Sequence, residues 1–218
     1  MNQTQKILLS FDLDNTLINN REGIVNSFNY ALNKYNLQSL ERNEIEAMIG
    51  IPLIEMFERI TNENSSNLIT AFREFYSKTG IYQANLLPGV RDKLTELSQN
   101  SFTLGVITSK KQELAIKITK ILKIFKYFIY VLGESDSIKN KLDSNLKTHL
   151  LQKYHEYRIV IIGDHPKDKA LAEKLKAPFV GVLTGNHSAE ELISGSLIKT
   201  LILDSVRDLE PKMIYNLL

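Results

Sequence analysis

The chain has 218 residues, of which 43% are apolar and 24% are charged, which is the balance of a folded globular protein. It carries 27 Lys and Arg against 25 Asp and Glu, so the net charge gives no reason to expect a nucleic-acid partner. The lack of cysteine excludes a disulfide scaffold, a Cys-ligated zinc site and a thiol nucleophile.

Six apolar runs of strand length are separated by segments whose apolar residues recur at helical spacing. The runs are continuous rather than alternating, which is typical of strands buried on both faces of a parallel sheet. They cover residues 6–11, 102–108, 127–132, 158–163, 178–183 and 199–203. This alternation of strands and helices predicts an α/β fold, a Rossmann-like three-layer core with a parallel sheet between helices.

One stretch of the chain breaks this alternation. Between residues 20 and 86 no strand pattern is convincing, and apolar residues such as Ile24, Phe28 and Leu32 recur at helical spacing. We therefore predict an all-helical insert at residues 19–86, placed within a core formed by residues 1–18 and 87–218.

Polar residues gather where three of the predicted strands end. The first strand leads into two acids, the second into two hydroxyl residues, and the fourth into two further acids: Asp12, Asp14, Thr108, Ser109, Asp164 and Asp168. Because the carboxyl ends of parallel strands share one edge of a sheet, we expect these side chains to lie close together.

This set of side chains favours phosphate chemistry. Several carboxylates converging at one edge repel one another unless a cation is present, and Mg²⁺ is the usual oxygen-bound ion for phosphate reactions. Asp12 can act as a nucleophile because carboxylates form acyl-phosphates. Asp14 can protonate the leaving oxygen and later activate water, and Thr108 can donate a hydrogen bond to a phosphoryl oxygen. A lysine would neutralise charge on the transferring group.

Five segments of the chain carry a resemblance to a known family. FDLDNTL (11–17), VITSK (106–110) and VIIGDHPKDKALA (160–172) resemble the first, second and fourth motifs of the haloacid dehalogenase superfamily. LPGVRDKLTEL (87–97) resembles the segment that re-enters the core, and MIGIPLIEMFERI (48–60) the cap of the phosphoglycolate phosphatase-like branch. The resemblance implies a Mg²⁺-dependent phosphatase with a helical cap, working through an aspartyl-phosphate.

The resemblance also implies roles for individual residues. Asp12 is the nucleophile and a Mg²⁺ ligand, and Asp14 is the acid/base that also binds Mg²⁺ through its backbone carbonyl. Asp164 is a further Mg²⁺ ligand, Asp168 supports the metal site, and Thr108 contacts the phosphoryl group.

Three further residues are expected to contact the substrate. Ser109 follows Thr108 at the end of the second strand. Gly50 and Pro52 are expected to shape the loop of the cap that faces the site.

The sequence departs from the family pattern at three places, one of which is His165, where a small residue is more common. Asn15 stands where glycine is usual, and asparagine tolerates a positive φ better than most residues. No Lys-Pro pair marks the third motif. We predict that Lys141 supplies its lysine, because a helix over 142–154 would be about 20 Å long and could run back across the sheet. Lys147 and Lys139 remain alternatives.

Several expectations concern partners and location. The expected substrate is a small phosphorylated metabolite: phosphoglycolate, pyrophosphate or a nucleoside monophosphate. A phosphosugar mutase on the same fold and a non-catalytic phosphate-binding or partner-binding protein are the alternatives. We expect a monomer or homodimer.

No apolar run approaches the roughly 20 residues that span a membrane, and the N-terminus lacks the features of a secretory signal. We therefore expect a cytoplasmic protein with no membrane partner and no nucleic-acid partner. Lysines at positions 117, 120, 123 and 126 are expected to form a solvated helix face, and His165 a turn near the site.

Overall fold

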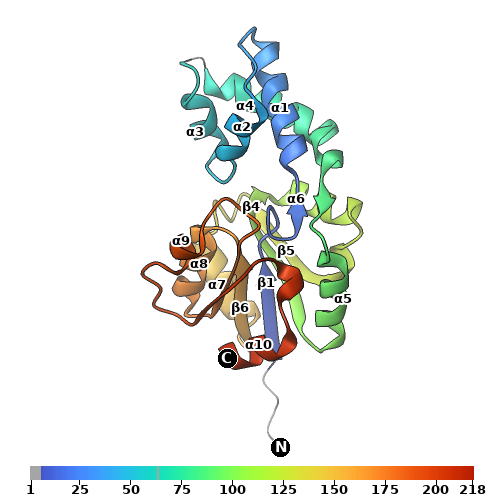
Figure 1. Cartoon of the computed structure of the whole chain (residues 1–218), viewed down its shortest axis with the longest axis vertical. Helices are drawn as coiled ribbons and strands as arrows, with labels where there is room; N and C mark the ends of the chain where they lie inside the picture. Colours follow the sequence, from blue (N-terminus) through green and yellow to red (C-terminus); the bar gives the residue numbers. More distant parts are fainter. Residues whose placement is uncertain (1–5, 63) are drawn as a thin grey trace, which may run out of the picture. The chain divides into compact units, whose positions relative to one another are not determined.

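The computed structural model describes residues 6–62 and 64–218 and divides the chain into two compact units (Figure 1). The core unit comprises Met1–Ile18 and Leu86–Leu218, and the helical unit comprises Asn19–Asn85. Among the described residues, no helix is both long enough and apolar enough to cross a membrane.

A six-stranded parallel sheet forms the centre of the core unit. Its strands lie in the order β5-β4-β1-β6-β7-β8. Their bounds are Lys6–Phe11 (β1), Thr103–Lys111 (β4), Phe128–Glu134 (β5), Tyr157–Gly163 (β6), Phe179–Val182 (β7) and Thr200–Leu203 (β8). The strand β1 is therefore central, and the order in which the chain adds strands reverses beside it, which is where ligands bind in sheets of this kind.

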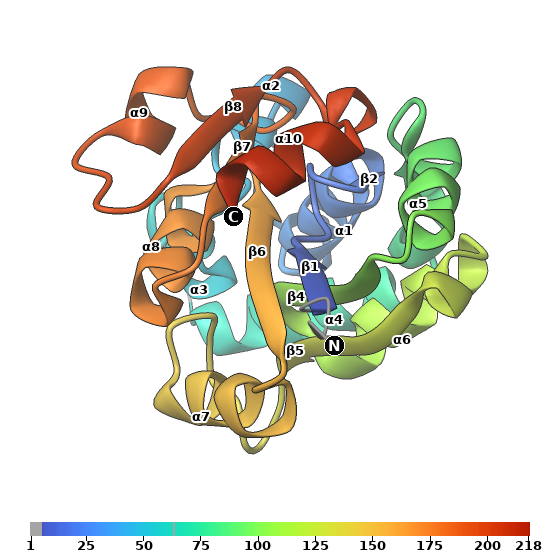
Figure 2. The same cartoon turned by 90° about the horizontal axis from the view of Figure 1, so that it is seen from below.

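Helices cover both faces of this sheet. Figure 2 shows α5 (Val90–Gln99) and α6 (Gln112–Ile121) on one side, and α7 (Ser144–Lys153) and α8 (Pro166–Leu175) on the other. The shorter elements are α9 (Ala189–Ile193), α10 (Pro211–Leu217), η2 (Phe125–Tyr127) and η3 (Val206–Asp208). One buried cluster joins the sheet to α7 and α8 through Leu8, Ile161, Leu146, Leu150 and Leu171.

The predicted α/β fold is confirmed, and each of the six predicted strands is present. The largest difference concerns β4, which was expected to end at residue 108 but continues to Lys111. The polar residues Ser109, Lys110 and Lys111 show no strand pattern in the sequence. They extend the strand because Lys111 pairs with Glu134 of β5, beyond a shift in register after Ile107. Thr108 consequently lies within a strand rather than after one.

In its described residues, the helical unit contains four α-helices and one turn of 3₁₀ helix. Their bounds are Arg21–Lys34 (α1), Arg42–Ala47 (α2), Leu53–Glu58 (α3), Ser65–Lys78 (α4) and Gly80–Gln83 (η1). A core of its own holds them together, in which the rings of Phe28 and Phe57 stack at 4.2 Å among Leu32, Ile45 and Leu68.

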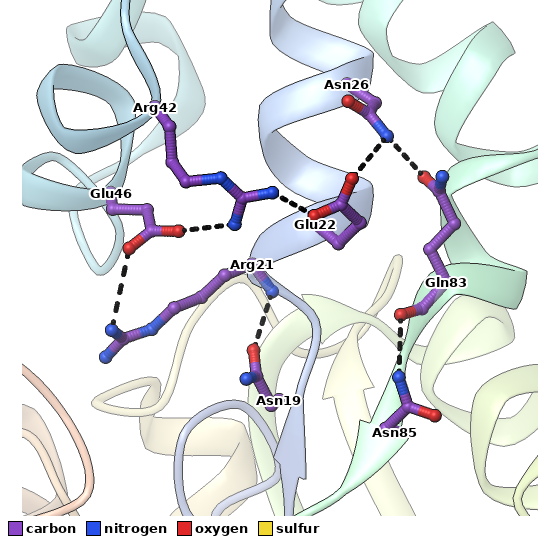
Figure 3. A network of polar contacts seen from close by, with 8 residues as sticks. All are labelled: Asn19, Arg21, Glu22, Asn26, Arg42, Glu46, Gln83 and Asn85. Carbon is purple, nitrogen blue, oxygen red and sulfur yellow. Dashed lines mark hydrogen bonds and ion pairs between the residues drawn. The ribbon is translucent and has the colours of Figure 1, made fainter.

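A network of polar side chains joins the start of α1 to α2 (Figure 3). Arg42 contacts both Glu22 and Glu46, and the Arg21 guanidinium lies 3.7 Å from the Glu46 carboxylate. Asn26 donates a hydrogen bond of 3.1 Å to Glu22. Ion pairs between side chains this exposed are screened by solvent, so the network adds little to the stability of the helical unit.

Two short strands mark the passages between the units. They are β2 (Ile18–Asn19) and β3 (Asn85–Leu86), which pair with each other as a two-stranded sheet. A backbone hydrogen bond of 3.0 Å from Leu87 to Leu17 continues this pairing. Neither β2 nor β3 was expected, because two residues are too few to show a pattern.

Candidate active site

The first motif forms a tight turn directly after the central strand. The Asp12 amide donates to the Ile162 carbonyl at 2.7 Å, so Asp12 continues the pairing of β1 with β6. Asn15 adopts a φ of 57° and its amide donates to the Ile18 carbonyl at 2.8 Å. Asparagine is thus compatible with the left-handed turn that this position requires, as the sequence predicts.

Three buried carboxylates meet at the carboxyl edge of the sheet. Asp12 follows β1, and Asp164 and Asp168 come from the turn after β6 and the first turn of α8. One oxygen from each lies within 4.8 Å of the others, and the three residues are at most 7% exposed. Sequence positions more than 150 residues apart therefore form one cluster.

A single buried lysine lies among these carboxylates. The Lys141 ammonium is 2.6 Å from Asp12 Oδ1 and 2.6 Å from Asp168 Oδ1. Lys139 is exposed and Lys147 is half-buried. Of the three lysines that the sequence leaves open, Lys141 is the one that the structure brings to the carboxylates.

The helix that follows Lys141 begins later than predicted. It starts at Ser144 rather than near residue 142, because Asp143 caps it by accepting a hydrogen bond of 2.8 Å from the Asn145 amide. The second oxygen of Asp143 accepts from the Lys139 amide at 2.8 Å. Lys141 consequently lies in a turn before the helix rather than within the helix itself.

Burial and charge strongly perturb the titration of these groups. Burial raises the pKa of Asp12 well above its usual range, and it raises the pKa of Asp164 to about 6, with the neighbouring Asp168 carboxylate adding to the effect. Burial alone would lower the pKa of Lys141, but the Asp12 and Asp168 carboxylates outweigh it and raise that pKa. One lysine does not neutralise three carboxylates, so the negative charge that remains can be balanced by a further cation.

The chemistry of this donor set fits a hard divalent cation. The three side chains of the cluster, Asp12, Asp164 and Asp168, offer carboxylate oxygens, with neither sulfur nor imidazole among them, and such ligands suit Mg²⁺. The Asp14 backbone carbonyl, a further ligand that the family resemblance implies, remains a prediction.

Neighbouring groups hold the Asp164 carboxylate in place. Thr16 donates a hydrogen bond of 2.7 Å to Asp164 Oδ1. A Cβ on Gly185 would overlap Asp164 Oδ2, so the loop after β7 can approach this carboxylate only because residue 185 is glycine. Thr16 and Gly185 were not singled out in the sequence, although Thr16 belongs to the first motif.

The turn after β6 is closed by a reciprocal cap. The Asp168 carboxylate accepts from the His165 amide at 3.2 Å, and the His165 ring accepts from the Lys167 amide at 3.0 Å. Burial lowers the pKa of His165 to about 4, so its ring is neutral at pH 7. The position of His165 is that of a turn residue, as expected.

Asp14 and Ser109 are more accessible to solvent than the three clustered carboxylates. The Asp14 carboxylate is about a quarter exposed and lies 3.1 Å from the Lys110 ammonium, a partner that the sequence did not indicate. Thr108 is buried and its hydroxyl accepts from the Lys110 amide at 3.2 Å, whereas Ser109 is exposed. Thr108 and Lys141 line the same narrow crevice of the core unit.

Two of the expected substrate residues belong to the helical unit. Gly50 has a φ of 113°, and Pro52 is the residue before the first turn of α3. Together they form the bend between α2 and α3. Their predicted contact with substrate remains a prediction.

A model of a known protein family covers most of the chain. The family is described as haloacid dehalogenase-like hydrolase, and it matches residues 9–182. The chain belongs to the haloacid dehalogenase-like hydrolase family. The resemblance drawn from the sequence motifs is therefore confirmed.

Individual relatives of this hydrolase carry several names. It is 28% identical over 160 residues to pyrophosphatase PpaX of Oceanobacillus iheyensis, covering 72% of this chain and 74% of that protein. It is 26% identical over 195 residues to the phosphoglycolate phosphatase of Photorhabdus laumondii, covering 84% and 83%. It is also 30% identical over 179 residues to tyrosine-protein kinase PtkA of Mycobacterium tuberculosis, covering 80% of this chain and 62% of that kinase.

A solved structure agrees with the architecture of the hydrolase. The crystal structure of a predicted phosphatase from Clostridium acetobutylicum matches it with a TM-score of 0.82 and 26% sequence identity, covering 97% of this chain and all of that one. The structural similarity therefore includes the fold of the core unit and the fold of the helical unit.

Proposed function

We propose that this hydrolase is a Mg²⁺-dependent phosphatase that cleaves a small phosphorylated metabolite through a phosphorylated Asp12. The chain is a phosphatase within its family, a conclusion that the family model and the phosphatase relatives support. The observation that carries the rest is the buried cluster of Asp12, Asp164 and Asp168, whose charge Lys141 only partly offsets.

The core residues divide the first chemical step among them. An Asp12 carboxylate oxygen attacks phosphorus, the bond from phosphorus to the leaving oxygen breaks, and Asp14 donates the proton that this oxygen needs. Thr108 and Lys141 hydrogen-bond the phosphoryl oxygens as charge moves onto them. Mg²⁺, held by Asp12, Asp164 and the Asp14 carbonyl with support from Asp168, would supply positive charge to the phosphoryl group.

The second step returns the enzyme to its starting state. Water attacks phosphorus, Asp14 accepts the proton from that water, and the bond between Asp12 and phosphorus breaks to release inorganic phosphate. The partial exposure of the Asp14 carboxylate suits a group that exchanges protons with solvent, and its ion pair with Lys110 fixes its direction. The neighbouring acids thus take different roles because their surroundings differ.

The substrate is proposed to be phosphoglycolate, pyrophosphate or a nucleoside monophosphate. The first two are the substrates named in two relatives. The helical unit is proposed to act as the cap that selects among them, with Gly50 and Pro52 shaping its substrate loop and Ser109 contacting the substrate from the core. We propose a cytoplasmic monomer or homodimer without nucleic-acid or membrane partners.

A panel of phosphorylated metabolites tests the proposal. Phosphate release should require Mg²⁺, stop with EDTA, and be fastest for one of the three proposed substrates. If a sugar phosphate is isomerised with little phosphate released, the chain is a mutase. If no substrate in the panel is turned over at millimolar concentration with Mg²⁺, the non-catalytic alternative replaces the proposal.

Replacing Asp14 by asparagine should separate the two steps. The substrate p-nitrophenyl phosphate has a leaving group that needs no proton, so Asp14→Asn should still form the acyl-phosphate but hydrolyse it slowly. Rapid-mix assays should show a burst of about one nitrophenol per enzyme followed by a rate at least about 10²-fold below that of the unmodified enzyme. Steady turnover at the original rate, or a slow rate without a burst, would contradict the role of Asp14.

Mg²⁺ should stabilise the fold more at pH 7.5 than at pH 5. Without a cation, folded Asp164 keeps its proton up to about pH 6, whereas an unfolded aspartate loses it near pH 4. The contribution of Asp164 to stability is therefore present below pH 4 and lost as the pH rises through 6. The rise in Tm on adding Mg²⁺ should be larger at pH 7.5, and this difference should shrink in Asp164→Asn. An equal rise at both pH values would contradict the assignment.

A further inference from the structure

A basic hollow lies on the core unit among α5, the end of α6 and η2. It has a volume of about 380 Å³ and is lined by Arg91, Lys120, Lys123, Phe125 and Lys126. Its three lysines are exposed, as expected of a solvated face, but only Lys120 lies on α6, since Lys123 and Lys126 follow its end. An arginine from a second helix joins them around a concave surface.

Hydrogen bonds from Arg91 connect the two helices that line this basic hollow. The Arg91 guanidinium donates to the carbonyls of Leu122 at 2.8 Å and Lys123 at 3.3 Å, the last groups of the turn that follows α6. These bonds fix α5 against the end of α6 and leave part of the guanidinium fork for another acceptor. The basic hollow is therefore built by two elements rather than by one flexible face.

The charges around the basic hollow have no carboxylate partners among the residues that the structure describes. Within the described part of the core unit, none of the four cations forms an ion pair, whereas Lys6 pairs with Glu156 on the same unit. Like charges gathered around a concave surface raise the local concentration of anions. An anionic ligand would therefore be attracted here without having to displace a bound carboxylate.

The topology separates the basic hollow from the active site. Lys126 precedes β5, whose first residue Phe128 pairs with Leu104 near the start of β4. The basic hollow thus lies towards the amino ends of these parallel strands, whereas Asp12 and Asp164 follow the carboxyl ends of β1 and β6. A ligand in the basic hollow would occupy a second site.

We propose that the basic hollow binds a nucleoside triphosphate. Phe125 is 38% exposed and offers an aromatic ring to a base, and the four cations surround it with donors for phosphate oxygens. The volume lies within the range of small-ligand sites. Lys120 holds its ammonium 5.1 Å from the Phe125 ring centre, which places positive charge next to the proposed base position.

Calorimetric titration with ATP in the presence of EDTA tests this proposal. Removing Mg²⁺ leaves the active-site carboxylates to repel phosphate, so that binding reports on the basic hollow. The double variant Lys120→Glu/Lys126→Glu should weaken ATP binding at least about tenfold. The matched control is Lys153→Glu/Lys199→Glu, which makes the same charge change at exposed lysines elsewhere on the core unit and should change the affinity less than about twofold.

A second variant tests the aromatic part of the proposal. Phe125→Ala should weaken ATP binding but leave the weaker binding of inorganic tripolyphosphate unchanged. Absence of saturable ATP binding, equal losses in the two double variants, or tripolyphosphate binding as tightly as ATP would overturn the proposal. A single-stranded oligonucleotide that binds far more tightly than ATP would overturn it as well, because the surface would then recognise a strand.

Discussion

Replacing Asp12 by asparagine is expected to lower turnover by at least about 10⁴-fold. The change removes the nucleophile and one anionic ligand of the proposed metal site. The fold should survive, because Asp12 is a buried carboxylate whose pKa is raised by burial, and a neutral amide at this position carries a smaller cost of desolvation. Phosphate release under saturating Mg²⁺ and Tm together measure the two effects.

The control for this variant is Asp204→Asn. Asp204 follows β8 of the same sheet and is exposed, so Asp204→Asn makes the same chemical change away from the carboxylate cluster. Its turnover should equal that of the unmodified enzyme. An Asp12→Asn protein that retains full activity would overturn the mechanism, and one that is inactive but unfolded would overturn the expected tolerance of the fold.

Replacing Lys141 by alanine is expected to lower kcat by about 10²–10³-fold, the usual loss when a charge-stabilising donor is removed. Lys141 has an ammonium 2.6 Å from both Asp12 and Asp168. Its removal leaves two buried carboxylates facing each other, so Tm without Mg²⁺ should fall as well. Measuring kcat at saturating Mg²⁺ separates the catalytic loss from this loss of stability.

The two other lysines of this region provide matched comparisons. Lys139→Ala and Lys147→Ala should change kcat little, because Lys139 is exposed and Lys147 lies on the helix beyond the capped start of α7. Near-normal turnover in Lys141→Ala, accompanied by a collapse in Lys147→Ala, would assign the third motif to Lys147.

The sequence was informative where a feature depends on residue type or on the order of the strands. Continuous apolar runs predicted the six strands, because burial on both faces excludes polar residues from the run itself. The positive φ of Asn15 followed from a preference of that residue type. The clustering of Asp12 with Asp164 followed from topology alone, since carboxyl ends of parallel strands share an edge.

The remaining features depend on contacts that sequence spacing does not encode. Thr16 meets Asp164 across 148 positions, and Gly185 approaches the same carboxylate from a third segment. The extension of β4 depends on pairing with the neighbouring strand β5 rather than on the residue types within the extension. The basic hollow required Arg91 to reach the end of α6, which no lysine periodicity could indicate.

The paired strands β2 and β3 have an implication for how this chain could have arisen. They bring residues on either side of Asn19–Asn85 next to each other, with Leu17 and Leu87 joined by a backbone hydrogen bond. A segment whose two ends are adjacent can be gained, lost or exchanged in evolution as one module, because a tight loop could join the same two points. Catalytic residues on the sheet can then be retained while the inserted module diversifies independently.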